Sequence, residues 1–388
     1  MKFSGYIIKR KIENIFIMPF ILVGRLIARL QPLSTEYDTF FFFPFYHTGG
    51  AEKVHASIVK ATGNENSIIF FTRKSVDDRF LSEFKNSKCR IIDISKYTDN
   101  KWLYFLNLVW RGRITTYINQ QKNKPVVFNG QSNFGYKISP WIYQSIKQVE
   151  LIHSFNSFSW IRIPFLPFIS KTIMISKLRI EEHLQQYQQL NIPKEYNSRI
   201  NFIQNAIELP GENCSKPINE QIKILFVGRG TPEKRPELFI DIARQTPQLE
   251  FTLVGEMPPS ILNNLPSNVQ ALNNVSDVHQ LHNIYCQHHI LIIPSSTEGF
   301  PIVLIEAMAR GCAVMATPVG DIPLHINDQN GFLFSSLDQQ IVLSEAIQWL
   351  NRLTIEKIRS LNITAKEYAF KNFGIETFNQ QYKAILQP

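Results

Sequence analysis

Two glutamates, Glu298 and Glu306, stand eight positions apart and are the residues whose spacing says most about chemistry. In a continuous helix they would lie about 12 Å apart. The two carboxylates of a glycosidase stand roughly 5–9.5 Å apart around one bond, so joint cleavage of one bond is disfavoured, although a folded-back loop would shorten the gap. Two polyols with a phosphate between them fit the spacing better, and a nucleotide-sugar has that layout.

The elements around these acids are predicted by the local pattern. A short apolar run, 289–293, predicts a buried strand, and a polar loop follows it. Pro301 suits the first position of a helix over 302–310, and Gly311 suits its C-cap. This helix is apolar on nearly every side, so Glu306 must be buried and must have polar partners. The N–H groups at the helix start suit an anion, preferably a phosphate.

Two cations in a second loop suit the same ligand. A strand predicted over 222–227 is followed by Gly228, Arg229 and Lys234, and a helix starts near Pro236. Point charges beside a helix N-terminus favour a pyrophosphate, although a solvated basic loop would show the same residues. A dinucleotide fingerprint beginning at Gly228 is disfavoured, because Glu233 stands where its third glycine belongs.

These motifs resemble those of retaining GT-B glycosyltransferases, family 4, also called glycosyl transferases group 1. The run Glu298-Gly299-Phe300-Pro301-Ile302 with Glu306 resembles the Glu-x7-Glu motif of that family. The resemblance implies that Glu298 touches the donor sugar and that Glu306 holds the ribose hydroxyls, with the intervening residues part of the donor site. The stretch containing Arg229 and Lys234 is similar to the family's donor motif, whose cations neutralise the leaving diphosphate.

The first half of the chain contains two further candidates. After an apolar strand over 37–44, Gly49 and Gly50 allow backbone N–H groups to approach a ligand, although a tight turn also explains them. His153 ends a short strand over 150–153, the sheet edge at which open α/β proteins bind ligands. It resembles the family's histidine facing the reacting sugar, but a structural hydrogen-bonding role is equally compatible with its position.

Strand and helix patterns alternate along most of the chain, which predicts a doubly wound α/β fold. The resemblance implies the GT-B arrangement, in which two Rossmann-like domains face a cleft and a C-terminal helix crosses back to the N-domain. We expect an N-terminal extension over 1–36, an acceptor-side domain over 37–205, a nucleotide-sugar domain over 206–370 and a crossover helix over 371–388.

The N-terminal extension contains an apolar segment, 15–24, with basic residues on both sides. It is too short to span a bilayer, and Pro19 interrupts it. We expect an interfacial anchor on the inner face of the cytoplasmic membrane, or alternatively a helix packed on the protein body. The net charge of +9 also favours an anionic partner, with nucleic acid the least favoured because no nucleic-acid motif is present.

Cysteines and histidines give little indication of a metal. The four cysteines are scattered, which is typical of thiols in a reducing, cytoplasmic setting. His279, His282 and Cys286 share a helical face, but no second pair of ligands follows at zinc-like spacing. We therefore expect no metal and no cofactor. An aromatic stretch over 155–168 could line an acceptor site, touch lipid or lie in the core.

The combined expectation is transfer of a hexose or N-acetylhexosamine from a nucleotide-sugar to a cell-envelope glycan or lipid-linked acceptor, with retained anomeric configuration. No protein base is evident, and the resemblance implies that the leaving phosphate accepts the proton. Two alternatives stay open: a nucleotide-sugar 2-epimerase on the same fold, and a non-catalytic GT-B protein that binds a glycan or a partner. The sequence does not name the donor base, the sugar or the acceptor.

Overall fold

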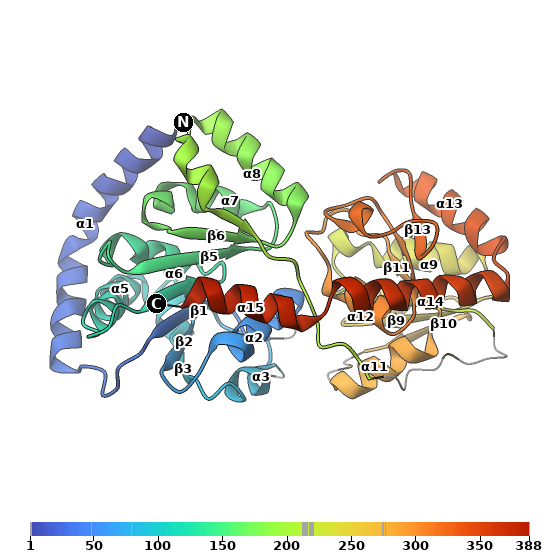
Figure 1. Cartoon of the computed structure of the whole chain (residues 1–388), viewed down its shortest axis with the longest axis horizontal. Coiled ribbons are helices and arrows are strands. Elements are labelled where there is room, and N and C mark those ends of the chain that lie inside the picture. Colours follow the sequence, from blue (N-terminus) through green and yellow to red (C-terminus); the bar gives the residue numbers. More distant parts are fainter. Residues whose placement is uncertain are drawn as a thin grey trace. The chain divides into compact units, whose positions relative to one another are not determined.

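The computed structural model describes residues 2–47, 49–78, 80–211, 216, 221–273, 275 and 277–387. The chain divides into two compact units, each built on one parallel sheet (Figure 1). The first unit contains Met1–Ile203 together with Asn379–Pro388, and the second contains Gln204–Phe378. The two units are described separately below.

The first unit has a seven-stranded parallel sheet in the order β3-β2-β1-β4-β5-β6-β7. Its strands are β1 (Thr39–Phe43), β2 (Ser67–Phe71), β3 (Arg90–Asp93), β4 (Val126–Asn129), β5 (Lys147–Ile152), β6 (Lys171–Met174) and β7 (Ile200–Phe202). Its helices are α1 (Phe3–Leu30), α2 (Gly50–Thr62), α3 (Leu81–Lys85), α4 (Ser95–Thr98), α5 (Tyr104–Asn119), α6 (Asn133–Ile138), α7 (Ser157–Ile161) and α8 (Lys177–Leu190). The doubly wound α/β prediction is therefore confirmed for this unit.

Strand β1 shows why the sheet forms from this sequence. All five of its residues are buried, and four of them are phenylalanines. An unbroken apolar strand is typical of a parallel sheet covered on both faces, where alternation would leave polar groups in the core. Phe42 stacks on Phe70 of β2 with ring centroids 5.3 Å apart, so the register is fixed by ring packing as well as by the ladder.

The second unit has a six-stranded parallel sheet in the order β10-β9-β8-β11-β12-β13. Its strands are β8 (Lys223–Val227), β9 (Glu250–Val254), β10 (Val269–Leu272), β11 (Ile290–Ile293), β12 (Ala313–Ala316) and β13 (Gly331–Leu333). Its helices are α9 (Pro236–Gln245), α10 (Pro259–Leu262), α11 (Val278–Gln287), α12 (Ile302–Ala309), α13 (Gln339–Asn351) and α14 (Ile355–Asn372).

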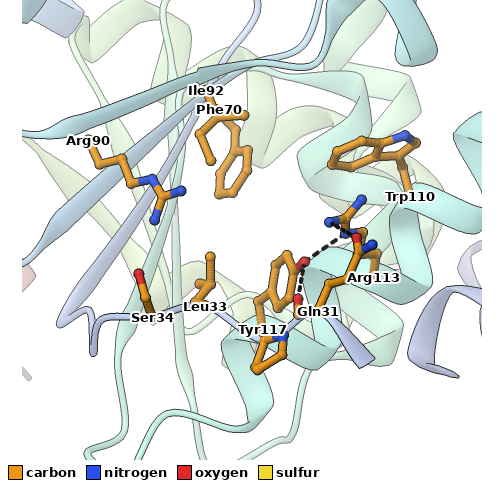
Figure 2. A pocket seen from close by; sticks show the side chains of 10 residues that line it. Gln31, Leu33, Ser34, Phe70, Arg90, Ile92, Trp110, Arg113 and Tyr117 are labelled. Carbon is orange, nitrogen blue, oxygen red and sulfur yellow. Dashed lines mark hydrogen bonds between the residues drawn. The ribbon is translucent and has the colours of Figure 1, made fainter. Parts of the chain in front are cut away.

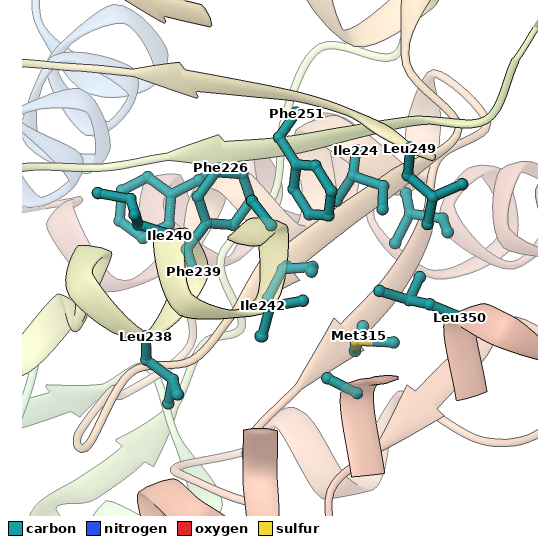
Figure 3. Packing of buried hydrophobic residues seen from close by; sticks show 14 of the residues in the cluster. Ile224, Phe226, Leu238, Phe239, Ile240, Ile242, Leu249, Phe251, Met315 and Leu350 are labelled. Atoms are coloured by element: carbon teal, nitrogen blue, oxygen red, sulfur yellow. The ribbon is translucent and has the colours of Figure 1, made fainter. Parts of the chain in front are cut away.

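The core of the second unit lies between helix α9 and the sheet (Figure 3). Phe239 of α9 contacts both Phe226 of β8 and Phe251 of β9, with ring centroids 5.5 and 5.4 Å apart. All three side chains are buried. This packing holds α9 against β8 and β9, and the loop with the predicted cations joins β8 to α9.

Helix α15 (Ile375–Leu386) starts in the second unit and ends in the first, as predicted for the crossover helix. Tyr382 is fully buried in the first unit, where its ring lies 6.4 Å from that of Phe128 on β4. Lys147 Nζ donates to the carbonyl of Gln387 at 2.9 Å. The last residues of the helix therefore complete the core of the unit that the chain left at residue 203.

The aromatic stretch over 155–168 lies only partly in the core, since Phe165 is buried while Trp160 is 44% exposed. Arg162 is fully buried and donates through Nε to both oxygens of the buried Glu150 at 3.0 Å. Its Nη1 donates to the Tyr187 hydroxyl at 2.7 Å. Burial alone would raise the pKa of Glu150, but Arg162 and its hydrogen bonds outweigh this and lower it. Arg162 is therefore a core residue, as the core alternative for this stretch predicted at that position.

The cysteines depart in part from the sequence expectation. Cys89 and Cys312 are free and buried, as expected for thiols used in packing. Cys286 is disulfide-bonded, so the expectation fails there. Cys214 lies outside the described residues.

Helix α1 packs along α5 at the edge of the first unit (Figure 1). The two backbones touch: a Cβ on Gly24 would lie 2.0 Å from the Val109 carbonyl oxygen, and one on Gly112 would lie 2.1 Å from that of Ile21. Glycine is required at this crossing because no side chain fits between the helices. Among the described residues, no helix has both the length and the apolar character needed to cross a bilayer.

The crossing gives a stability prediction. We expect Gly24→Ala to lower the free energy of unfolding by about 1–3 kcal/mol, because the added methyl group meets backbone that cannot rotate away. This loss should appear although alanine is the better helix former. Gly211→Ala is the matched control, because a Cβ there meets nothing within 4 Å. Urea denaturation of both variants checks the prediction, and equal stabilities would contradict it.

Two buried histidines give a pH prediction. Burial lowers the pKa of His183 and of His288 to about 4, and each ring donates from Nδ1 to a carbonyl one helical turn back at 2.6 Å. Because the folded pKa lies below the unfolded value of about 6.5, stability is full above pH 6.5 and is lost as pH falls toward 4. At pH 5 the loss is roughly 2 kcal/mol per histidine.

Urea denaturation of His288→Gln at pH 7 and pH 5 measures this term. The variant should lose less stability than the parent chain between the two pH values, because one of the titrating groups is gone. His279→Gln, at an exposed position on α11, should behave as the parent chain. An unchanged pH dependence in His288→Gln would contradict the prediction.

Candidate functional site

The predicted donor residues of the second unit lie at the point where its strand order reverses. Strands β8 and β11 are neighbours there, with Ile290 paired to Ile224, while the other strands run outward from them on either side. Ligands of open α/β sheets bind at the carboxyl ends of the strands at such a switch point. The loop after β8 contains Arg229 and Lys234, and the loop after β11 contains Glu298.

An ion pair joins these two loops. Lys234 Nζ donates to Glu298 Oε1 at 2.5 Å, and both side chains are mostly buried, with 23% and 10% exposed. The Ser296 N–H also donates to the Glu233 carbonyl at 2.8 Å, so backbone and side chains hold the loops together. A charge-assisted bond of this length is stronger than a neutral one. The structure therefore brings together two residues 64 positions apart that the sequence assigned to one ligand.

The loop after β8 is held by backbone contacts with the turn after β9. A Cβ on Gly255, where φ is +130°, would lie 1.9 Å from the Gly228 carbonyl oxygen. Glycine is therefore needed at this turn for two reasons, its φ and the close approach. Arg235 also has a left-handed φ of 52°, which ends the loop just before α9. Arg229 is exposed, and its charge contributes with the Thr231 hydrogen bond to a lowered pKa at Glu233, against the opposing effect of burial.

Helix α12 begins where the second loop ends. Pro301 is its N-cap rather than its first residue, and Gly311, with φ +70°, closes it. The N–H groups of Gly311 and Cys312 donate to the carbonyls of Met308 and Ala307 at 2.8 Å, which is the Schellman pattern. The helix therefore has fixed ends, and its N-terminus follows directly on the loop with Glu298.

Residues 299–302 pack the loop against its surroundings. The Gly299 carbonyl accepts from the Asp321 N–H at 2.9 Å, and a Cβ on Gly320, at φ +56°, would lie 2.0 Å from that oxygen. Phe300 is buried, with its ring 4.6 Å from that of His325. Ile302 is also buried. Gly299, Phe300, Pro301 and Ile302 therefore support the loop that presents Glu298.

Glu306 lies in the middle of α12 and is only 3% exposed. Its Oε2 accepts from the Tyr285 hydroxyl of α11 at 3.1 Å, which supplies the buried partner that the sequence requires. Burial and the adjacent carboxylate raise the pKa of Tyr285 well above 10. Sequence reasoning missed Tyr285, because nothing in the α11 pattern distinguishes this tyrosine from a core residue.

The glycine candidates of the first unit follow β1 and also lie at a switch point, between β1 and β4. Gly49 is the N-cap of α2, and a Cβ there would lie 2.2 Å from Glu52 Oε2. Gly50 is exposed, and a Cβ there would meet nothing within 4 Å. The helix start at Gly50 is therefore open, and packing within the chain does not require glycine at that position.

His153 follows β5 and pairs with a second histidine. Its Nε2 lies 2.9 Å from Nε2 of His55, which is 1% exposed and belongs to α2. Burial lowers the pKa of His153 to about 4, and burial with the neighbouring ring lowers that of His55 well below 6.5. Both rings are neutral at pH 7, so one donates and the other accepts. His55 was missed, although it follows the Gly-Gly loop by one helical turn.

Within the ranges that the structure describes, no group of three or more histidine, cysteine or acidic side chains could hold a metal ion. His279 and His282 lie on the same helix with ring centroids 6.3 Å apart.

The sequence of the second unit matches a known family. Residues 221–352 match the family described as "Glycosyl transferases group 1". The matched segment includes both loops of the ion pair and the whole of α12.

Curated relatives are distant and partial. A 41.2 kDa protein of unknown role in the cps region of Klebsiella pneumoniae is 23% identical over 203 residues, 48% of this chain and 56% of that protein. The O-antigen biosynthesis glycosyltransferase WbnH of Escherichia coli is 26% identical over 171 residues, 43% of this chain and 47% of that one. The chain thus spans about half of the length of these relatives.

Solved structures show the fold over nearly the whole chain. HepE of Anabaena, solved with UDP and glucose, is 16% identical with a TM-score of 0.70, over 90% of this chain and 99% of that one. Sucrose-phosphate synthase of Thermosynechococcus elongatus is 18% identical with a TM-score of 0.70, over 90% and 98%. Residues 221–352 therefore match the family of glycosyl transferases group 1, and the chain as a whole has the GT-B fold.

Proposed function

We propose that this chain is a retaining glycosyltransferase that moves a hexose or N-acetylhexosamine from a nucleotide-sugar to a cell-envelope glycan or lipid-linked acceptor. The observation that carries the proposal is the ion pair between Lys234 and Glu298 at the switch point of the second unit. It joins a cation in the loop before α9 to a carboxylate in the loop before α12, and such groups near helix N-termini suit a sugar linked to a diphosphate.

The cations would act on the leaving group. As the bond from the sugar to the diphosphate breaks, negative charge grows on the phosphate oxygens. Lys234 is held in place by Glu298, and Arg229 is exposed on the same loop, so both can offset that charge with little rearrangement. Such electrostatic stabilisation commonly contributes about 3–4 kcal/mol per donor. We further propose that these cations take the role that a divalent metal has in other transferases.

The two acids would hold the ends of the donor. Glu298 keeps one oxygen on Lys234, and its carboxylate can orient hydroxyl groups of the sugar. Glu306 would bind the ribose hydroxyls, since a carboxylate can accept from both members of a diol. The Tyr285 hydroxyl fixes the Glu306 side chain from the side of α11.

The first unit would supply the residues that contact the reacting sugar and the acceptor. With a pKa of about 4, His153 is a weak base at neutral pH, so we assign it orientation of the sugar rather than proton abstraction. The leaving phosphate would then take the acceptor's proton. The open helix start at Gly49 and Gly50 offers backbone N–H groups to an anionic part of donor or acceptor.

The relatives support the chemical class of both substrates. HepE was solved with UDP-glucose as well as with UDP and glucose, which are a nucleotide-sugar and its parts. WbnH acts in O-antigen biosynthesis, and the Klebsiella pneumoniae relative is encoded in a cps region. These names favour a nucleotide-sugar donor and an envelope glycan acceptor for this chain.

The experiment that tests the proposal is a panel of nucleotide-sugars in excess EDTA. A bound donor should stabilise the folded state by mass action and so raise the melting temperature. At a donor concentration one hundred times its dissociation constant, the free energy of unfolding should rise by about 2.7 kcal/mol. The stabilising donor is then supplied with lipid-linked acceptors, and NMR of the product gives the anomeric configuration. Inversion would exclude the retaining mechanism. Turnover of donor without acceptor would point to an epimerase, and binding without turnover to a non-catalytic protein.

Lys234→Ala tests the leaving-group role. We expect kcat to fall by roughly 100- to 1,000-fold, because a preorganised charge that stabilises the departing diphosphate is lost. Lys223→Ala is the control, since this lysine lies at the opposite end of β8 and is paired with Glu250 at 3.6 Å. Initial rates at saturating donor measure the effect. An unchanged kcat in Lys234→Ala would show that the leaving-group assignment is wrong.

Glu306→Gln tests the ribose role. We expect the KM for the donor to rise about tenfold with kcat little changed, since a charged hydrogen bond contributes roughly 1.5–3 kcal/mol to binding. Because Glu306 is buried, the melting temperature of the variant is measured first. Tyr285→Phe keeps the carboxylate but removes its partner, and should show a smaller rise in KM. A normal donor KM in a folded Glu306→Gln would exclude the role.

A further inference from the structure

Helix α1 presents large apolar side chains to solvent along its whole length. Each of the following is at least half exposed: Ile8, Ile12, Ile15, Phe16, Leu22, Val23, Leu26 and Leu30. Ile15, Phe16 and Leu30 reach 70–75%. Soluble proteins seldom expose a contiguous apolar surface of this extent unless it has a partner.

Six of these side chains, together with Pro19, form one stripe. Positions 8, 12, 15, 19, 22, 26 and 30 recur at intervals of three or four, which places them on one face of a helix. The buried residues Ile21, Gly24 and Ala28 lie on the opposite face, against α5. The helix is therefore apolar on both sides, and only one of them is covered by the protein.

The exposed face cannot turn inward, because α1 is fixed at its C-terminal end. The Gly24 crossing leaves no space between the backbones of α1 and α5. The chain that follows is tied to α5: the Tyr117 hydroxyl donates to the Gln31 carbonyl at 2.8 Å, and Arg113 Nη2 donates to Gln31 Oε1 at 3.0 Å (Figure 2). Gln31, Arg113 and Tyr117 are among the residues that line a cavity of about 210 Å³.

Aromatic residues next to α5 extend the apolar surface. Phe20 of α1 stacks on Phe105 of α5 with ring centroids 5.4 Å apart. Phe105 is 64% exposed, and Trp102, just before α5, is 94% exposed. Tryptophan and other aromatic rings are enriched at the level of lipid headgroups. We call the α1 stripe together with Trp102 and Phe105 the apolar face.

Basic residues border the apolar face on both sides. At 100° per residue, Lys11 and Arg29 fall on one edge of the stripe and Lys9 on the other, and all three are exposed. Glu13 is the one acidic residue of α1, and Arg10 pairs with it at 2.7 Å. Apolar side chains flanked by lysine and arginine are typical of a helix that lies in the plane of an anionic membrane surface.

We propose that the apolar face is a docking surface for an anionic lipid bilayer, with α1 lying parallel to the membrane and its stripe at the boundary of headgroups and acyl chains. At 28 residues the helix is about 42 Å long, so its contacts extend across most of the first unit. The basic edges would reach the phosphates while their aliphatic stems cover apolar surface. The proposal does not depend on the reaction assigned above.

Self-association is the competing use of such a face. A two-fold pair joined through this stripe would bring the basic edges of two copies together, and like charges oppose that contact. The same edges favour phosphate-bearing lipids. The charge pattern therefore selects the bilayer over a second copy of the chain.

Vesicle flotation with the full chain tests the proposal. Vesicles containing phosphatidylglycerol and phosphatidylcholine are compared with vesicles of phosphatidylcholine alone, at low and high salt. We expect binding to the anionic vesicles that high salt weakens, and at least tenfold weaker binding for the double variant Ile15→Asp and Leu22→Asp. The double variant Lys11→Glu and Arg29→Glu should lose the preference for anionic vesicles.

The matched control is a double variant of exposed apolar residues elsewhere, Val76→Asp and Ile363→Asp, which are 84% and 61% exposed. It should float as the parent chain does. Equal flotation of the α1 variant and the parent chain would overturn the proposal. A second result would also overturn it: the parent chain does not float, and sedimentation equilibrium shows a dimer that the double variant Ile15→Asp and Leu22→Asp converts to monomers.

Nucleotide-sugar binding is measured on the same samples by thermal shift. Vesicle binding without any donor binding would leave the membrane surface intact and reject the proposed reaction. Donor binding that is equal in all variants, with vesicle binding lost only in the α1 variants, would show that the apolar face acts independently of the donor site.

Discussion

The ion pair between Lys234 and Glu298 is the interaction on which the donor site of the second unit depends. It joins the loops after two neighbouring strands, and it holds one positive and one negative group beside a helix N-terminus. Removing either partner would take the ion pair away from the other, whose side chain is mostly buried. The glycines at 255 and 320 allow the backbone approaches that hold these loops, so the pair is supported by turns that tolerate no side chain. The two loops that the local sequence predicted to bind one ligand are thus joined to each other in the fold.

In the first unit, the polar side chains that meet beside the strand ends are neutral. These are His55 and His153, and burial keeps both rings uncharged at pH 7. An uncharged pair of histidine rings can orient a polar ligand by hydrogen bonding without attracting ions strongly. The two units therefore differ in the polar groups at these positions: the second unit has an ion pair and the first has a pair of neutral rings.

Many of the strands and helices could be predicted from the sequence, because apolar runs and helix-end signals are formed by neighbouring residues. Strands such as Ser67–Phe71 and Glu250–Val254, and the helix between Pro301 and Gly311, follow from residues that lie next to one another. Partners brought together by the fold could not be predicted. Tyr285, His55 and the buried pair of Glu150 and Arg162 depend on contacts between elements distant in sequence. Nor could the sequence show which side of the N-terminal helix stays uncovered, since both sides are apolar.

The path of helix α15 has a consequence for biosynthesis. Tyr382 fills a place beside Phe128 in the first unit, yet the ribosome makes it only after all strands of the second unit. Until then the nascent first unit lacks the side chain that fills this position beside β4. The first unit can therefore complete its packing only after the whole of the second unit has been synthesised.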